Sequence, residues 1–438
     1  INNYCYPENP EAGIDLFLEK LVQETEKEHE DILEQADETD AMFGELYSWY
    51  LRNPEYRSRV QKLVQSAFAG KPEDIISQSV AKALYGEVSP YSATRLERFA
   101  ACAFAHFLQY GMKLTERVEY EFKPMDMGNV MHGALESFAE EVRKRGMKWT
   151  ELTEQERNEI ADRCLDNIVA DYGNTVLKSS ARNEYMIERT RRILRRTVWA
   201  LQKQLEQGEF QPEGFEVTFG GGRIDRVDIM EDQNKVYVKV IDYKTGNTSF
   251  DLVYLYHGLQ LQLMIYLDGA LRVEQKKYPD KEIIPAGVFY YNIKDPMIQE
   301  KIDADVEAVS AGLMKELKMN GLVQADPELV YRMDSSLGSI PVAFNKDGSF
   351  RKNSSVADRT QFAVLGRYVR TKIEKIRSSI LEGDAEVSPY ELGKKNACTY
   401  CPYMTVCGFD RRLSGYEFRR LKNFSDEELW KAFDREAE

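Results

Sequence analysis

Two aspartates and a lysine on consecutive predicted strands are the residues most able to do chemistry in this sequence. Asp225 lies in GGRIDRVD, and Asp242 and Lys244 lie in VIDYK. Residues two apart on a strand leave the same face, and a short turn between the strands can bring Asp225 close to Asp242. Two carboxylates suit Mg²⁺ or Mn²⁺, and a lysine beside them can orient or help deprotonate a bound water. This combination is suited to hydrolysing a phosphodiester.

The alternative for these residues is an ordinary ion pair on an exposed strand. Their neighbours argue against it, because Ile224, Val240 and Ile241 are apolar and predict buried strands. Charged groups inside such a core are costly unless they are paired or bound to a metal. The sequence therefore favours a metal site over a surface ion pair.

Three further residues could complete this site. His132 lies in MGNVMHGALESF, near the start of a predicted helix, and an imidazole can complete a carboxylate metal site. Gln262 and Tyr266 are four residues apart in a predicted helix and share one face, where they could hold a nucleic-acid strand. A lone helical histidine is more commonly a packed or surface residue, so His132 alone does not identify the site.

The elements that must position these residues follow from the hydrophobic pattern. In chain order, the expected elements are a Ser92-capped helix over 91–111, a β-prone stretch over 117–122, helices over 127–145, 153–173 and 182–207, three strands between 213 and 244, a helix over 259–271, a strand over 284–293 and a helix over 356–381. Strands interrupted by one helix and flanked by others predict a mixed α/β core.

Four short motifs in this order resemble the RecB-family branch of the PD-(D/E)xK nucleases. They are Gly-x-x-x-His at 128–132, Gly-x-Ile-Asp at 222–225, Asp-Tyr-Lys at 242–244 and Gln-x-x-x-Tyr at 262–266. The resemblance implies a restriction-endonuclease-like fold, in which helices flank a mixed central sheet over a core of residues 113–300. It also implies metal-dependent hydrolysis of DNA.

The same resemblance assigns a role to each residue of the motifs. It implies that Mg²⁺ or Mn²⁺ is held by His132, Asp225, Asp242 and the backbone carbonyl of Tyr243. It further implies that Lys244 positions the attacking water, and that Gln262 and Tyr266 orient the DNA strand.

Three cysteines near the end of the chain form a second candidate site. Cys398, Cys401 and Cys407 make a C-x₂-C-x₅-C pattern, which presents three thiolates to one metal centre and lacks the usual fourth ligand. Cys102 is the natural fourth, because it precedes the predicted core as the triplet follows it. Both an iron–sulfur cluster and zinc remain open, whereas disulfides are rare in cytosolic chains.

The placement of these cysteines resembles that in the AddB subunits of bacterial AddAB helicase–nucleases, over about residues 90–420. The resemblance implies a four-iron four-sulfur (4Fe-4S) cluster on these cysteines, an AddA-type partner subunit, and single-stranded DNA fed from a duplex end. It further implies cleavage of the 5′-terminated strand during recombinational repair of double-strand breaks. The alternatives are a catalytically idle DNA-binding or scaffolding module and a CRISPR-adaptation-type iron–sulfur nuclease, although such nucleases are shorter and lack the helical preamble.

Length and charge set the remaining expectations. The 438 residues carry a net charge of −14, of which residues 1–50 contribute −12 through 14 acidic and 2 basic side chains. The near-neutral remainder leaves a nucleic-acid partner open. No segment predicts a membrane span or a signal peptide, so we expect a cytoplasmic bacterial protein. We expect a helical preamble over 1–88 that ends a helicase-like region, a nuclease domain over 89–423 and a tail over 424–438.

Overall fold

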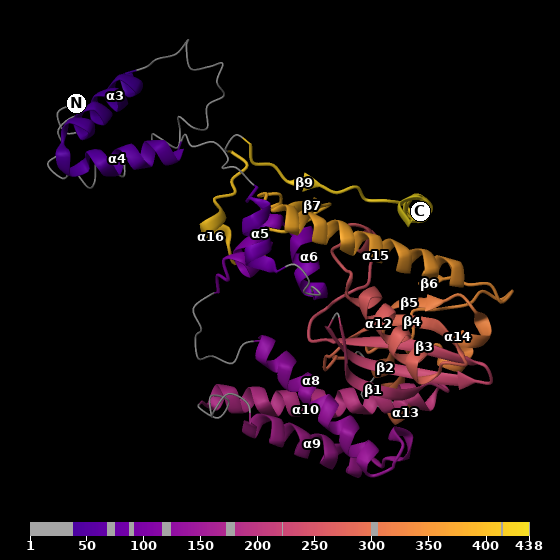
Figure 1. The fold of residues 1–438 in the computed structure, drawn as a ribbon. Coiled ribbons are helices and arrows are strands. Elements are labelled where there is room, and N and C mark those ends of the chain that lie inside the picture. Colours follow the sequence, from indigo (N-terminus) through magenta and orange to yellow (C-terminus); the bar gives the residue numbers. More distant parts are fainter. Residues whose placement is uncertain are drawn as a thin grey trace. The chain divides into compact units, whose positions relative to one another are not determined.

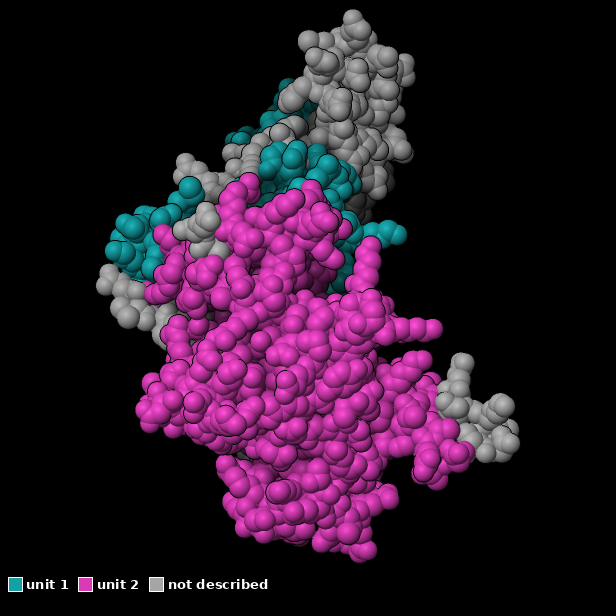
Figure 2. Space-filling model, turned by 90° about the vertical axis from the view of Figure 1, so that its right-hand side faces the viewer, with its two compact units in different colours: residues 1–84, 101–113, 380–422 teal, residues 85–100, 114–379, 423–438 magenta. Residues whose placement is uncertain are grey.

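The computed structural model divides into two compact units, which Figure 2 colours separately. The described residues are 38–67, 75–86, 92–115, 124–171, 180–220, 222–298, 305–412 and 415–437. Unit 1 is drawn from residues 1–84, 101–113 and 380–422, and unit 2 from residues 85–100, 114–379 and 423–438. No helix within the described ranges is long and apolar enough to cross a membrane.

Unit 2 is built on a six-stranded mixed sheet in which the strands lie in sequence order. The strands are β1 (Gln211–Phe219), β2 (Gly222–Asp232), β3 (Lys235–Lys244), β4 (Glu282–Asn292), β5 (Asn320–Gln324) and β6 (Val356–Ala357). β1, β2 and β3 are antiparallel neighbours, β4 runs parallel to β3, β5 is antiparallel to β4, and β6 is parallel to β5. The predicted mixed α/β core is confirmed.

Helices cover both faces of this sheet (Figure 1). One face packs against α8 (Pro124–Lys144), α9 (Glu154–Asp171) and α10 (Ala181–Glu206) through a shared apolar core. On the other face, α12 (Gln262–Lys277) packs along β2, β3 and β4, and it forms the connection that makes β4 parallel to β3. The other helices that contribute to unit 2 are α6 (Ala93–Ala101), α11 (Leu252–Tyr256), α13 (Val306–Glu316), α14 (Pro327–Met333), α15 (Arg359–Glu382) and α17 (Asp426–Ala437), together with the short 3₁₀ turn η2 (Trp149–Glu151).

Strands β2 and β3 are buried along almost their whole length, which explains why their sequences are rich in apolar residues. Alternate residues of a strand point to opposite faces. Asp225, Asp242 and Lys244 therefore belong to one face of the sheet, and Arg226 and Asp228 belong to the other.

Unit 1 contains helices and a small sheet. Its elements are α3 (Glu38–Arg52), α4 (Pro54–Ala67), α5 (Gln78–Tyr85), α7 (Ala103–His106), the π-helical turn η1 (Phe107–Gly111), α16 (Met404–Cys407) and the strands β7 (Tyr390–Leu392), β8 (Lys395–Asn396) and β9 (Arg419–Arg420), in the sheet order β8-β7-β9. α3 and α4 pack on each other through Leu46, Tyr50 and Val60. The described part of the expected helical preamble is thus helical.

The continuous helix predicted over 91–111 is wrong, because the helix breaks at Cys102. Ser92 accepts the backbone N–H of Arg95 and starts α6 as expected. Cys102 itself is extended, with φ −165° and ψ 118°, and α7 and η1 follow it. The extended residue turns the Cys102 side chain into a small apolar cluster with Ala105 and Tyr403. The β-prone stretch over 117–122 lies outside the described residues.

Candidate active site

Three carboxylates lie side by side on the first three strands of the sheet. In the antiparallel register of β1 and β2, Glu216 lies opposite Asp225. The register of β2 and β3 continues one step beyond the pair Arg226 and Ile241, and this step places Asp242 opposite Asp225. The predicted approach of Asp225 and Asp242 therefore follows from strand pairing, and Glu216 extends the row by one residue.

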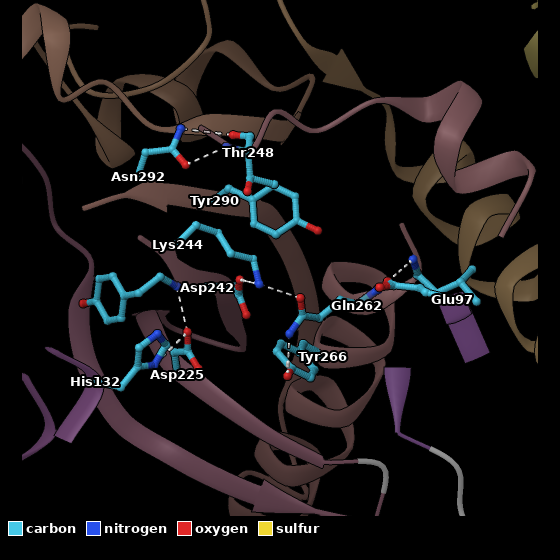
Figure 3. Close-up of polar contacts among 12 residues, drawn as sticks. Glu97, His132, Asp225, Asp242, Lys244, Thr248, Gln262, Tyr266, Tyr290 and Asn292 are labelled. Atoms are coloured by element: carbon cyan, nitrogen blue, oxygen red, sulfur yellow. Dashed lines mark hydrogen bonds and ion pairs between the residues drawn. The ribbon is translucent and has the colours of Figure 1, made fainter. Parts of the chain in front are cut away.

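His132 joins this row from α8. Its Nδ1 atom lies 3.5 Å from Oδ2 of Asp225 and 3.5 Å from Oε1 of Glu216. The donor atoms of these three residues all lie within 4.8 Å of one another. Asp225 is buried, and its Oδ2 atom also accepts the backbone N–H of Tyr243 at 2.7 Å (Figure 3). Three residues from three elements can thus present ligands to one metal ion.

The pKa values of His132 and Asp242 are shifted by burial and by the charges beside them. Burial lowers the pKa of His132, but hydrogen bonds to Asp225 and Glu216 outweigh burial and raise it to about 10. Burial and the nearby charge of Asp225 raise the pKa of Asp242 to about 7, although Lys244 opposes the shift. A divalent cation would relieve the repulsion between these carboxylates, so the residues present fit Mg²⁺ or Mn²⁺.

Lys244 connects the carboxylates to α12. Its Nζ atom lies 2.5 Å from Oδ2 of Asp242 and donates a 2.7 Å hydrogen bond to Oε1 of Gln262. The Nε2 atom of Gln262 in turn donates to the Tyr266 hydroxyl at 2.8 Å (Figure 3). Lys244 also lies 5.3 Å from the centre of the Tyr290 ring. The residues predicted to be catalytic therefore form one connected line, in which Gln262 holds the lysine.

The backbone of Tyr243 lies at the site, as the sequence predicts, whereas its ring is buried in the core. The ring meets Tyr291 edge to face at a centroid distance of 5.9 Å, and it meets the His132 ring at 6.1 Å. Its amide nitrogen fixes the carboxylate of Asp225. The role of its carbonyl as a metal ligand stays a prediction.

Glu216 is the site residue that the sequence analysis missed. EGFEVTFG contains both Glu213 and Glu216, and only the strand register decides which of the two lies opposite Asp225. The pairing of β1 with β2 shifts between Pro212 and Gly214, and Glu216 has a φ of 49°, an uncommon backbone conformation for a residue other than glycine. The Glu216 side chain is 7% exposed and also forms an ion pair with Arg223. Such backbone strain occurs preferentially at functional sites.

The four predicted cluster cysteines come together in unit 1. Cys102, Cys398, Cys401 and Cys407 are free thiols that line one small, apolar pocket. Burial raises the pKa of Cys398 to about 12, and the three neighbouring thiols add to the shift. The structure thus brings Cys102 to the triplet, although 296 positions separate residues 102 and 398 in the sequence.

The surroundings of these thiols fit a cluster that needs thiolate ligands. The backbone N–H of Phe409 donates to Sγ of Cys407 at 3.5 Å, after Gly408 turns the chain with a φ of 66°. Backbone N–H groups of Ala105 and Ser388 lower the pKa of the Cys102 thiol, although burial outweighs them. Hydrogen bonds to sulfur in an apolar setting are typical of iron–sulfur sites.

Comparison with known proteins agrees with this geometry. The family model for the PD-(D/E)XK nuclease superfamily matches residues 90–408. The AddB chain of the ATP-dependent helicase/deoxyribonuclease of Lachnoclostridium phytofermentans is 41% identical over 425 residues, which cover 92% of this chain and 36% of that protein. The corresponding AddB chain of Thermoanaerobacter sp. strain X514 is 34% identical over 425 residues, covering 92% of this chain and 37% of that protein.

These relatives define what the chain is similar to. The AddB chain of Clostridium acetobutylicum is 33% identical over 423 residues, covering 91% of this chain and 36% of that protein. The chain therefore spans little more than a third of the length of these curated relatives. The resemblance to the AddB subunits of helicase–nucleases is confirmed. With the matching family model, the row of carboxylates and the lysine beside it, the chain belongs to the PD-(D/E)XK nuclease superfamily.

Proposed function

We propose that this chain is the nuclease region of an AddB-type subunit of an ATP-dependent helicase/deoxyribonuclease, and that it hydrolyses phosphodiester bonds of single-stranded DNA. The observation that carries the proposal is the row of Glu216, Asp225 and Asp242, with His132 beside Asp225 and Lys244 beside Asp242. A site of this composition in a PD-(D/E)XK chain supports metal-assisted hydrolysis.

Five groups of the chain would hold the metal ion. They are His132, Glu216, Asp225, Asp242 and the carbonyl of Tyr243. When bound, Mg²⁺ or Mn²⁺ lowers the pKa of a water molecule and stabilises the charge that develops on the phosphate.

Lys244 would orient the attacking water. Asp242 and Gln262 fix its ammonium group from two directions, and the ammonium keeps a third hydrogen for a water molecule or a phosphate oxygen. Tyr266 holds the Gln262 amide and lies at the start of α12, where a DNA strand that reaches the metal ligands would pass. These contacts support the predicted roles of Gln262 and Tyr266 in positioning.

A nuclease assay with a matched pair of lysine variants tests the proposal. We expect the native protein to cleave single-stranded DNA with Mg²⁺ and to stop when a chelator removes the metal. Lys244→Ala should lower cleavage by about 100-fold or more. Lys281→Ala, whose lysine pairs with Glu231, should cleave like the native protein. An idle binding or scaffolding module would instead show no metal-dependent cleavage in any of these proteins.

We also propose that Cys102, Cys398, Cys401 and Cys407 hold a four-iron four-sulfur cluster. When bound, the cluster would cross-link two segments far apart in the sequence and so restrict the unfolded chain. An anaerobic preparation should be brown, should lose its colour with dithionite, and should contain iron and sulfide that a Cys102→Ala variant lacks. A colourless preparation with stoichiometric zinc would overturn this assignment.

The biological setting rests on the names of the relatives. We propose that the complete protein works with an AddA-type helicase–nuclease subunit in the bacterial cytoplasm and degrades the 5′-terminated strand at double-strand breaks during recombinational repair. A duplex labelled at either the 5′ or the 3′ end, cleaved by the assembled complex with the partner's nuclease inactivated, tests the strand. Release of the 3′ label alone would contradict the expected polarity.

A further inference from the structure

Helix α12 starts at the site without a cap from its own sequence. The residue at its N-cap position is Leu261, whose side chain cannot accept a hydrogen bond. Helices normally satisfy their first N–H groups with a Ser, Thr, Asp or Asn at this position. The residue that follows Leu261 is Gln262, the partner of Lys244. The start of this helix therefore determines where the catalytic lysine is held.

A glutamate from α6 supplies the missing cap. Oε1 of Glu97 accepts the backbone N–H of Leu261 at 2.7 Å and that of Gln262 at 2.9 Å (Figure 3). The two hydrogen bonds bridge 164 and 165 positions of the sequence. A carboxylate at a helix N-terminus is also favoured by the helix dipole. Glu97 thus fixes the first turn of α12 from a distant segment of the chain.

We infer that Glu97 is a positioning residue of the nuclease, whose carboxylate fixes the start of α12 so that Gln262 holds Lys244 against Asp242. The inference rests on the proposed function. Glu97 forms hydrogen bonds only to the α12 backbone among the contacts described, so it acts through Gln262 and not on the reacting atoms.

The electrostatics of Glu97 agree with this placement. Burial raises its pKa to about 7, although the two N–H groups of α12 lower it. The charge of Lys244 lowers the pKa further and that of Asp242 raises it, so Glu97 lies within the field of both groups. A cap in this position is therefore coupled to the charges of the site, whereas an ordinary surface cap is not.

Asp326 provides the matched control, because it caps another helix with the same number of bonds. Its Oδ1 atom accepts the backbone N–H of Glu328 at 3.0 Å and that of Leu329 at 3.3 Å, at the start of α14. Among the described contacts, none joins these residues to the row of Glu216, Asp225 and Asp242 or to Lys244. Loss of either cap should therefore cost similar stability, and only the loss of Glu97 should change catalysis.

The experiment compares kcat, KM for single-stranded DNA and melting temperature in the full-length protein with its partner subunit. Glu97→Ala should lower kcat by about 10- to 100-fold, since small misplacements of catalytic groups have effects of this size. Its KM should stay within about twofold. Asp326→Ala should lower the melting temperature by about as much as Glu97→Ala does, and it should keep the native kcat. Glu97→Gln should restore most of the kcat, because the amide oxygen still accepts both N–H groups.

Two further measurements separate positioning from general damage. In a Gln262→Ala background, Glu97→Ala should change kcat by less than about twofold, because Glu97 acts through Gln262. Hydrogen exchange at the first turn of α12 should be about fivefold faster in Glu97→Ala, and that of α14 should be unchanged. Should Glu97→Ala not fold, Glu97→Asp, which is too short to reach both amides, replaces it.

The inference and the proposed function fail in different ways. Two results would overturn the positioning role in a protein that still cleaves DNA. One is a native kcat in Glu97→Ala or Glu97→Asp. The other is a double variant whose loss of kcat is the product of the losses in Glu97→Ala and Gln262→Ala. A native protein that lacks metal-dependent cleavage would overturn the proposed function and, with it, this inference.

Discussion

Strands β2 and β3 take part in two groups of charged residues, and the groups differ in how their charge is balanced. The site row consists of Glu216, Asp225 and Asp242. The buried triad consists of Arg226, Asp228 and Lys239. Because neighbouring residues of a strand point to opposite faces, the same two strands contribute to both groups.

In the buried triad, two cations contact one carboxylate. Asp228 is fully buried and accepts hydrogen bonds from Nε and Nη2 of Arg226 at 2.5 and 2.9 Å. The Nζ atom of Lys239 lies 3.0 Å from Oδ2 of the same carboxylate. Burial alone would raise the pKa of Asp228, but the charges of Arg226 and Lys239 outweigh burial and lower it.

The site row shows the opposite shift. The pKa of Asp242 is raised, because burial and the charge of Asp225 outweigh the charges of Lys244 and His132. The chain thus places two buried cations on one carboxylate in the triad, whereas it groups three carboxylates in the site row, where we propose that a metal binds. A buried carboxylate whose pKa is raised by another carboxylate is therefore a better sign of a site than burial alone.

The largest effect expected from this comparison is on catalysis. Asp242→Asn should lower cleavage of single-stranded DNA by about 1,000-fold or more, because a metal ligand is lost. The melting temperature of the metal-free protein should not fall, since the substitution removes repulsion. A nuclease assay and thermal unfolding check both parts. Asp280→Asn, at an exposed turn, is the control, and equal activity in the two variants would contradict the site assignment.

The second effect is on stability. Asp228→Ala should lower the free energy of unfolding by about 3 kcal/mol, because it leaves Arg226 and Lys239 buried without a counter-charge. Urea unfolding measures the loss. Replacing all three residues together, as Arg226→Met, Asp228→Leu and Lys239→Met, should recover most of it. A loss as large in the triple variant as in Asp228→Ala would show that the triad does more than balance charge.

The third effect separates two glutamates of β1. Glu216→Gln should weaken Mg²⁺ binding and cleavage by about 10- to 100-fold, since its carboxylate belongs to the site row. Glu213→Gln should behave like the native protein, because Glu213 is bonded to Lys277 away from the site. Titration of Mg²⁺ by calorimetry, together with the nuclease assay, tests the pair. Identical Mg²⁺ affinity in the two variants would remove Glu216 from the row of ligands.

The smallest effect is a difference in pH dependence. The pKa of Asp242 rises from 3.8 to about 7 on folding. Between these values the folded protein holds a proton that the unfolded chain has released, so its stability falls as pH rises, by up to about 1.4 kcal/mol per pH unit. Asp228 has the opposite sign, since its lowered pKa contributes stability above pH 3.8 that is lost as pH falls below that value.

Urea unfolding of metal-free protein between about pH 4 and pH 7 measures the Asp242 contribution as the difference between the native protein and Asp242→Asn. The native curve should fall relative to that of the variant as pH rises. Mg²⁺ competes with the proton on Asp242, so saturating Mg²⁺ should abolish or reverse this fall. Parallel curves without metal would show that Asp242 titrates normally.

Much of the site was predictable because it lies on short, regular elements. Asp225, Asp242 and Lys244 lie among apolar residues that predict buried strands, and the hairpin between β2 and β3 is short. Their proximity therefore follows from the local pattern. Gln262 and Tyr266 share a helix face for the same reason. The thiol spacing of the C-terminal triplet likewise indicates one metal centre without any knowledge of the fold.

The break at Cys102, the contact of Glu97 with the start of α12 and the place of Glu216 in the site row were not predictable in this way. Helix propensity continues through Cys102, and the extended backbone there depends on residues near 387 and 403 that pack around it. Glu216 differs from Glu213 only through a register shift in β1.

The sequence by itself determined the strands that carry Asp225, Asp242 and Lys244, the residue types of the site and the family, because these depend on local periodicity and on spacing along the chain. Only the tertiary structure decided which glutamate joins the site row, which glutamate caps α12 and where the helix around Cys102 breaks. Each of these depends on contacts between distant segments, and so on strand register and on packing that no local window of sequence contains.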